Sequence, residues 1–190
     1  MKNIPNILTL FRIALVPVFI YFMFYFEPKS IAAFASLFVF VTASITDYFD
    51  GMLARKYKII SNFGKIMDPL ADKFLVISAL FALSTKTYYF IPMAVIIIII
   101  IREVAVTILR NYYMKKKIFI AANKWGKLKT VLQLTGIIAA LVYISLTFIF
   151  KELVNYNLVV FKIFRYYFWI VALVTVLSGA NYFTQLGAKK

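Results

Sequence analysis

Four aspartates lie close together in a chain that is otherwise poor in acidic residues. Only seven residues are Asp or Glu, and four of them fall between positions 47 and 72: Asp47, Asp50, Asp68 and Asp72. The first two are three positions apart and the last two are four apart, so each pair shares one face if its segment is helical. Four like charges raise their own pKa values unless cations neutralise them. Since carboxylate oxygens are preferred ligands of Mg²⁺ and Mn²⁺, the cluster predicts a site for two divalent ions.

The same segment contains small residues beside the acids. Gly51 and Ala54 continue the stripe of Asp47 and Asp50, and they leave room for a bulky group near the backbone. Paired metal sites of this kind neutralise phosphate oxygens during displacement reactions, so the segment suits a phosphorylated substrate. Pro69 is compatible with a helix here if it falls in the first turn. The alternative is a set of solvent-exposed ion pairs, in which the aspartates pair with nearby basic residues, namely Arg55, Lys58, Lys65 and Lys73.

The chain contains neither cysteine nor histidine. This absence excludes disulfides, zinc sites made from thiolates or imidazoles, Cys or His nucleophiles, and a Ser-His-Asp triad. Any chemistry must therefore use carboxylates, Lys, Arg, Tyr, Ser or Thr.

The composition is that of a membrane protein. Hydrophobic residues make up 64% of the 190 positions and the mean hydropathy is +0.89, whereas about half of a soluble domain is apolar. The first apolar run lacks the cleavage pattern of a signal peptide, so we expect it to be retained. We expect one all-α domain over residues 1–190, without internal repeats. Runs close to the ~20 residues needed to cross a bilayer predict six transmembrane helices, at residues 7–26, 30–45, 70–84, 88–109, 131–150 and 166–183.

The distribution of charge predicts the orientation. Most of the net charge of +15 lies in the loops between predicted helices, and Lys and Arg are most numerous in the loops after the second and the fourth, with four and seven residues. By the positive-inside rule these two loops face the cytoplasm, as do both termini, and the aspartates lie in the cytoplasmic half of the helix bundle. The same rule explains the basic composition without a nucleic-acid partner. We expect an integral protein of the plasma membrane.

The aspartates belong to a longer pattern, Asp47-x₂-Asp50-Gly51-x₂-Ala54-Arg55-x₈-Gly64-x₃-Asp68-x₃-Asp72. This pattern resembles, without departure, the signature of the CDP-alcohol phosphatidyltransferases. Three further segments are similar to the bacterial phosphatidylglycerophosphate synthase branch of that family: NIPNILTLFRI at residues 3–13, REV at 102–104 and GKLKT at 126–130.

The resemblance implies that an alcohol attacks the β-phosphorus of a CDP-linked lipid, CDP-diacylglycerol in this branch, and that CMP leaves. Asp47, Asp50, Asp68 and, at least in part, Asp72 would hold two Mg²⁺ or Mn²⁺ ions on the pyrophosphate. Asp72 would also take the proton of the attacking hydroxyl, a role that suits a chain without histidine. A homodimer among membrane lipids is the family expectation.

Family analogy also suggests contacts with the CDP portion. Gly51 would allow close approach, Arg55 would bind phosphate in a bidentate manner, and Ser61 would offer a polar contact. A role as a plain loop residue explains Ser61 equally well. The remaining candidates for binding the CDP-lipid are Ala54, Gly64, Asn6 and Thr9. The last two share a helical face with Arg12, and an interfacial cap with a snorkelling arginine is their alternative explanation.

The acceptor is predicted from basic residues. Residues 110–129 carry seven Lys and Arg, more than orientation alone requires. Arg110, Lys127 and Lys129 are candidates for binding an acceptor phosphate, which favours sn-glycerol 3-phosphate, with phosphatidylglycerol phosphate as the product. Inositol, inositol phosphate, serine and phosphatidylglycerol are the alternative acceptors, and positive-inside charge is the alternative role of each residue.

Arg102 and Glu103 interrupt the apolar run of the fourth predicted helix. Charges within a membrane usually face one another or a cavity. These two residues are therefore either a structural ion pair or part of the wall of the active-site cavity.

Two other functional classes fit part of the composition. A cation transporter would place acids near mid-membrane on several helices, whereas these aspartates cluster at helix ends beside a basic loop. A polybasic scaffold would bind anionic lipids but has no use for the aspartates. We therefore expect a metal-dependent phosphatidyltransferase of phospholipid biosynthesis.

Overall fold

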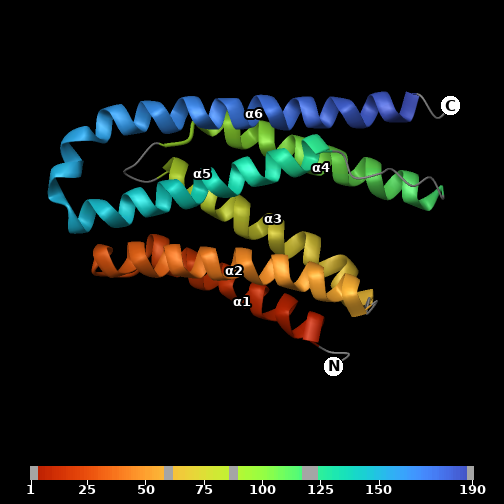
Figure 1. Ribbon diagram of the computed structural model, residues 1–190, viewed down its shortest axis with the longest axis horizontal. Helices are drawn as coiled ribbons and strands as arrows, with labels where there is room; N and C mark the ends of the chain where they lie inside the picture. Colours follow the sequence, from red (N-terminus) through yellow and green to blue (C-terminus); the bar gives the residue numbers. More distant parts are fainter. Residues whose placement is uncertain (1–3, 58–61, 86–89, 117–123, 188–190) are drawn as a thin grey trace. The chain divides into compact units, whose positions relative to one another are not determined.

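The computed structural model describes residues 4–57, 62–85, 90–116 and 124–187; for segments 4–9, 48–57, 62–70 and 181–187, and for a few single positions including Asp72, it describes the backbone alone. Within these residues the chain is helical and contains no strand (Figure 1), which confirms the all-α prediction. The helices are α1 (Ile4–Phe24), α2 (Lys29–Tyr57), α3 (Asn62–Thr85), α4 (Met93–Lys115), α5 (Lys124–Ile149), the 3₁₀ helix η1 (Lys151–Tyr156) and α6 (Asn157–Gly187).

Prolines stand directly before two of the helices. The carbonyl of Pro28 accepts a hydrogen bond from the amide of Ala32 at 3.1 Å, and the carbonyl of Pro92 accepts one from Val95 at 3.0 Å. A proline at a helix start loses nothing by lacking an amide donor, because the first amides of a helix have no partner within it. These two positions therefore help to set where α2 and α4 begin.

The predicted apolar runs are extended by polar sequence in α2, α3 and α5. α2 continues past residue 45 to Tyr57, α3 begins at Asn62, and α5 begins at Lys124. The aspartate motif therefore lies largely on helices. Pro69 is expected to be compatible with a helix only in the first turn. In the structure it lies inside α3, beyond the first turn. Apolar periodicity cannot show these extensions, because the added turns are polar.

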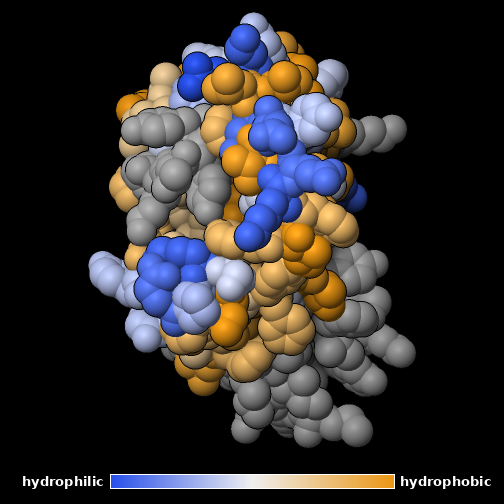
Figure 2. Space-filling view, turned by 90° about the vertical axis from the view of Figure 1, so that its left-hand side faces the viewer, coloured by the Kyte–Doolittle hydropathy of each residue, from blue (hydrophilic) through white to orange (hydrophobic). Residues whose placement is uncertain are grey.

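The surface suits a lipid environment. Three helical stretches are long and apolar enough to cross a membrane, Lys29–Asp47, Trp125–Ile149 and Lys151–Ala180, while Leu10–Phe24 and Lys73–Ser84 are shorter apolar helices. Large side chains such as Phe38, Leu158 and Leu173 are exposed, and Figure 2 shows hydrophilic patches separated by hydrophobic surface. The chain is a membrane protein, and the count of six spans stays a prediction.

The chain divides into two compact units. Unit 1 comprises Met1–Ala82 and Ile138–Asn155, and unit 2 comprises Leu83–Ile137 and Tyr156–Lys190. In unit 1, α1 packs along α2 (Figure 1), and the buried rings of Phe19 and Phe40 lie 5.9 Å apart between them.

In unit 2, α4 packs along α6. The ring of Phe90 lies 4.9 Å from those of both Phe161 and Phe164. α5 approaches α6 closely at Gly136, beside Tyr167, whose hydroxyl donates a hydrogen bond to the carbonyl of Leu132 at 2.9 Å. The missing side chain at Gly136 leaves space for the tyrosine ring.

Gly136→Ala is expected to lower the free energy of unfolding by about 1–3 kcal/mol through overpacking. The added Cβ would lie 2.5 Å from Cε1 of Tyr167 and 3.0 Å from Cζ of Phe168. Thermal unfolding in detergent, followed by circular dichroism, should show a lower midpoint. Gly126→Ala is the matched control, since its Cβ would meet only Oγ of Ser178, at 3.9 Å. Equal midpoints for the two variants would contradict this account of the α5–α6 contact.

Candidate active site

Asp47, the first acid of the motif, pairs with a buried arginine from another helix of unit 1. Nη1 of Arg12 on α1 lies 2.8 Å from Oδ1 of Asp47 on α2. The Arg12 side chain is 1% exposed, whereas that of Asp47 is 47% exposed. The pair therefore holds the carboxylate from its buried side and leaves the rest of it accessible to a ligand.

The sequence does not identify this pair. It suggests a snorkelling Arg12 or a substrate contact, whereas the structure buries Arg12 against Asp47. The available signal is that a charged residue inside an apolar helix needs a counter-charge, but the spacing names no partner. Asn6 and Thr9 lie about two turns and one turn before Arg12 along α1. Their side chains lie outside the described ones.

The backbone confirms the helical spacing of the four aspartates. α2 is unbroken from Lys29 to Tyr57, so Asp50 lies one turn after Asp47 on the same face. α3 carries Asp68 and Asp72 one turn apart. Of the four, Asp47 alone has a described side chain, and the described part of the chain contains no group of three or more possible metal ligands. The joint metal site therefore stays a prediction.

The candidate CDP-lipid residues continue the same two helices. Gly51 and Ala54 follow Asp47 and Asp50 by one turn each, so α2 carries a stripe of acids and small residues. Arg55 follows on α2, and Gly64 lies in the first turn of α3. Ser61 lies outside the described residues. The contacts predicted for these side chains stay predictions.

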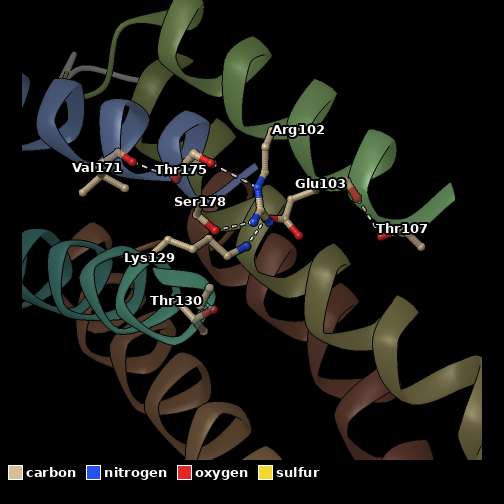
Figure 3. A network of polar contacts seen from close by, with 9 residues as sticks. Arg102, Glu103, Thr107, Lys129, Thr130, Val171, Thr175 and Ser178 are labelled. Atoms are coloured by element: carbon tan, nitrogen blue, oxygen red, sulfur yellow. Dashed lines mark hydrogen bonds and ion pairs between the residues drawn. The ribbon is translucent and has the colours of Figure 1, made fainter. Parts of the chain in front are cut away.

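Arg102 of α4 is the centre of a polar network within unit 2 (Figure 3). Its Nε donates to the carbonyl of Thr175 at 3.1 Å, and its Nη2 donates to Oγ of Ser178 at 2.5 Å, both on α6. Its Nη1 donates to Oε1 of Glu103 at 3.1 Å. A Cβ at Gly179 would lie 3.2 Å from Cγ of Arg102, so the arginine crosses α6 where no side chain stands. The ion pair that the sequence offers as one alternative is therefore present.

Lys129 of α5 joins this network. Its ammonium group pairs with the same Oε1 of Glu103, and the residue is only 7% exposed (Figure 3). Arg102, Lys129 and Glu103 together carry one net positive charge in a largely buried position. Burial of these charges is tolerable because each has an opposite charge in contact.

The structure separates the three residues proposed for the acceptor phosphate. Lys129 is buried against Glu103, whereas Arg110 on α4 and Lys127 on α5 are exposed. Lys127 and Lys129 are two positions apart, about 200° around the helix, so they point to different sides of α5. Among the three, Lys129 alone joins the buried network of described residues.

Gln133 is a buried polar residue near Lys129 that the sequence does not identify as a candidate site residue. Gln133 lies one turn further along α5, is 4% exposed, and its Nε2 has no hydrogen-bond partner within the described residues. Ser178 and Thr175 on α6 are also buried. No sequence pattern singles out these residues, because isolated Ser, Thr and Gln in apolar helices are common.

Lys116, which directly follows α4, stays protonated at neutral pH. A hydrogen bond from its side chain to Tyr112 raises the pKa of Lys116 above the usual range. The ammonium also lies 4.6 Å from the centre of the Tyr112 ring. This exposed charge fits an interfacial position beside lipid headgroups or other anions.

Comparison with known proteins identifies the family. The sequence matches the CDP-alcohol phosphatidyltransferase family over residues 2–178. The CDP-diacylglycerol–glycerol-3-phosphate 3-phosphatidyltransferase of Bacillus subtilis (strain 168) is 38% identical over 195 residues, which cover 97% of this chain and 95% of that protein. The protein of the same name from Rickettsia typhi is 36% identical over 184 residues, which cover 96% of each chain. A probable phosphatidylglycerophosphate synthase of Mycobacterium tuberculosis is 43% identical over 136 residues, 71% of this chain and 64% of that protein. The chain therefore belongs to the CDP-alcohol phosphatidyltransferase family.

Proposed function

We propose that this membrane enzyme transfers the phosphatidyl group of CDP-diacylglycerol to sn-glycerol 3-phosphate. The hydroxyl oxygen of the acceptor forms a bond to the β-phosphorus, the bond from that phosphorus to CMP breaks, and phosphatidylglycerol phosphate and CMP are the products. The observation that carries this proposal is the similarity, over nearly the whole chain, to relatives named for the same reaction. Because the family match runs over residues 2–178, we treat both units as one functional domain.

Members of this family generally use divalent metal ions. The donor set of this chain fits such ions: four aspartates in two pairs at helical spacing, with the one described carboxylate half exposed beside Arg12. Asp47, Asp50, Asp68 and Asp72 would hold two Mg²⁺ or Mn²⁺ ions. When bound, the ions would neutralise the pyrophosphate oxygens and the charge that develops on CMP.

Asp72 is proposed as the general base. The attacking hydroxyl must lose its proton, and this chain has no histidine to accept it. Asp72 is the last acid of the motif and lies one turn after Asp68 on α3. Its carboxylate would take the hydroxyl proton as the oxygen bonds to phosphorus.

The stripe of small residues on α2 is proposed to receive the CDP portion. Gly51 and Ala54 would let the substrate approach the backbone, and Arg55 would bind phosphate through its guanidinium fork. Gly64, Ser61, Asn6 and Thr9 are further candidates for contact.

Lys129 is proposed to bind the acceptor phosphate, and it is the best supported of the three candidates because its network carries net positive charge. An ammonium donates charge-assisted hydrogen bonds to a phosphate, whereas a neutral acceptor would gain little from it. Arg110 and Lys127 are exposed, so we propose that they attract anions at the surface.

The remaining proposals concern the surroundings of the enzyme. We propose that the protein lies in the plasma membrane; its distribution of Lys and Arg supports an orientation with the active site and both termini in the cytoplasm. A homodimer follows from the resemblance alone. No nucleic-acid partner is needed to explain the basic loops.

Purified protein with CDP-diacylglycerol and Mg²⁺ is expected to release CMP fastest with sn-glycerol 3-phosphate. Serine, inositol, inositol phosphate and phosphatidylglycerol serve as competing acceptors in the same assay. Replacing Lys129 with Gln should raise the Michaelis constant for glycerol 3-phosphate about tenfold, a loss of about 1.4 kcal/mol of binding. A wild-type preference for any other acceptor would overturn the proposed acceptor.

Asp72→Asn is expected to retain much of the binding of CDP-diacylglycerol while losing transfer, because the amide keeps the shape of the side chain but cannot accept the proton. Binding is measured by equilibrium dialysis with labelled CDP-diacylglycerol in micelles, and transfer by CMP release. Loss of binding with unchanged turnover of the bound fraction would point to a metal-holding role alone.

Arg12→Met is expected to reduce CMP release at least about tenfold, because Asp47 loses the contact that orients it. Methionine fills much of the buried volume, so thermal unfolding should separate loss of activity from loss of fold. Arg165→Met is the matched control, since Arg165 is exposed on α6. Wild-type turnover by a folded Arg12→Met protein would remove Arg12 from the site.

A further inference from the structure

We propose that Glu103 is a positioning residue for the acceptor phosphate. While no acceptor is bound, Glu103 holds the ammonium of Lys129. When the acceptor binds, the ammonium moves to the phosphate, and Arg102 continues to neutralise the Glu103 carboxylate. This inference rests on the proposed binding of the acceptor phosphate by Lys129. It assigns a role to an acid outside the aspartate motif.

Arg102 is the fixed part of the network. Two of its nitrogens donate to α6, Nε to the carbonyl of Thr175 at 3.1 Å and Nη2 to Oγ of Ser178 at 2.5 Å. Its side chain also lies against Gly179, where a Cβ would come within 3.2 Å. The guanidinium is therefore anchored to α6 whether or not Lys129 is near.

Glu103 shares one oxygen between two cations. Oε1 accepts from Nη1 of Arg102 at 3.1 Å and from the ammonium of Lys129. If Lys129 turns away, Glu103 keeps its contact with the anchored arginine. A buried carboxylate without a counter-charge would be costly, and the exchange avoids this because Glu103 stays paired with Arg102.

Lys129 is the part that can move. Its ammonium is a point charge with three donors on a flexible stem, and it reaches Glu103 from a different helix, α5. Among the described residues the network has two cations and one anion, so one dianionic or monoanionic phosphate can be added to it without creating a large excess of charge. Competition from Glu103 lowers the affinity for phosphate, and this lets a product that keeps its phosphate leave.

The test uses inorganic phosphate as a competitive inhibitor of CMP release with glycerol 3-phosphate. Glu103→Gln removes the competing charge, so the inhibition constant for phosphate and the Michaelis constant for glycerol 3-phosphate should both fall about threefold to tenfold. In the Lys129→Gln background, the same substitution should change them by less than about twofold, because position 103 then has no Lys129 ammonium to hold or release.

Glu152→Gln is the matched control. It makes the same change in net charge at an exposed position on η1, so both constants should stay at their wild-type values. Inhibition by CMP, which reports on the nucleotide site, should be unchanged in Glu103→Gln.

Unchanged or raised constants in Glu103→Gln overturn the inference, as does an equal gain in the Lys129→Gln background. If Glu103→Gln is not monodisperse in detergent, Glu103→Asp replaces it. That variant keeps the charge but withdraws it by one methylene, and both constants should still fall, while unchanged ones overturn the inference. Failure of the proposed function is seen separately, in wild-type protein that prefers a neutral acceptor, and it removes this inference as well.

Discussion

Burial of ionised side chains between apolar helices is the constraint that shapes both halves of this enzyme. An ion taken out of water is stable in such a place only if an opposite charge or several hydrogen bonds accompany it. Arg12 meets this condition through Asp47 in unit 1, and Arg102 meets it through Glu103, Thr175 and Ser178 in unit 2. Each polar cluster is therefore tied to the packing of particular helices.

The two clusters differ in the sign of charge that they can offer to a ligand. In unit 1 the cation is the buried member and the half-exposed member is a carboxylate, so the accessible charge is negative. In unit 2 two cations share one carboxylate, so the excess charge among the described residues of the network is positive. The proposed reaction, between a metal-bound pyrophosphate and a phosphorylated alcohol, would use one site of each kind. The difference in sign fits that proposal.

The sequence predicts the class of fold and the kind of chemistry well, because both depend on local patterns. Long apolar runs predict helices, and the spacing of Asp47 to Asp50 and of Asp68 to Asp72 needs only the helical period. The partner of Arg12 could not be predicted. A helix that is hydrophobic on all sides does not show how it is rotated about its axis, and rotation decides which residues of α1 and α2 meet. For the same reason Lys129 is recognised as a cation, but its contact with Glu103 is not.

Close packing of helices is what makes the charged network of unit 2 possible. The side chain of Arg102 lies close to α6 at Gly179, where a Cβ would come within 3.2 Å of its Cγ, and its Nε donates to the carbonyl of Thr175. The Thr175 carbonyl is part of the backbone of α6. The helix therefore anchors the charge of Arg102 through a backbone group and not through a charged side chain. A side chain at position 179 would crowd the stem of Arg102, which would have to shift. Gly179 would therefore support the proposed acceptor site through Arg102, without touching the acceptor itself.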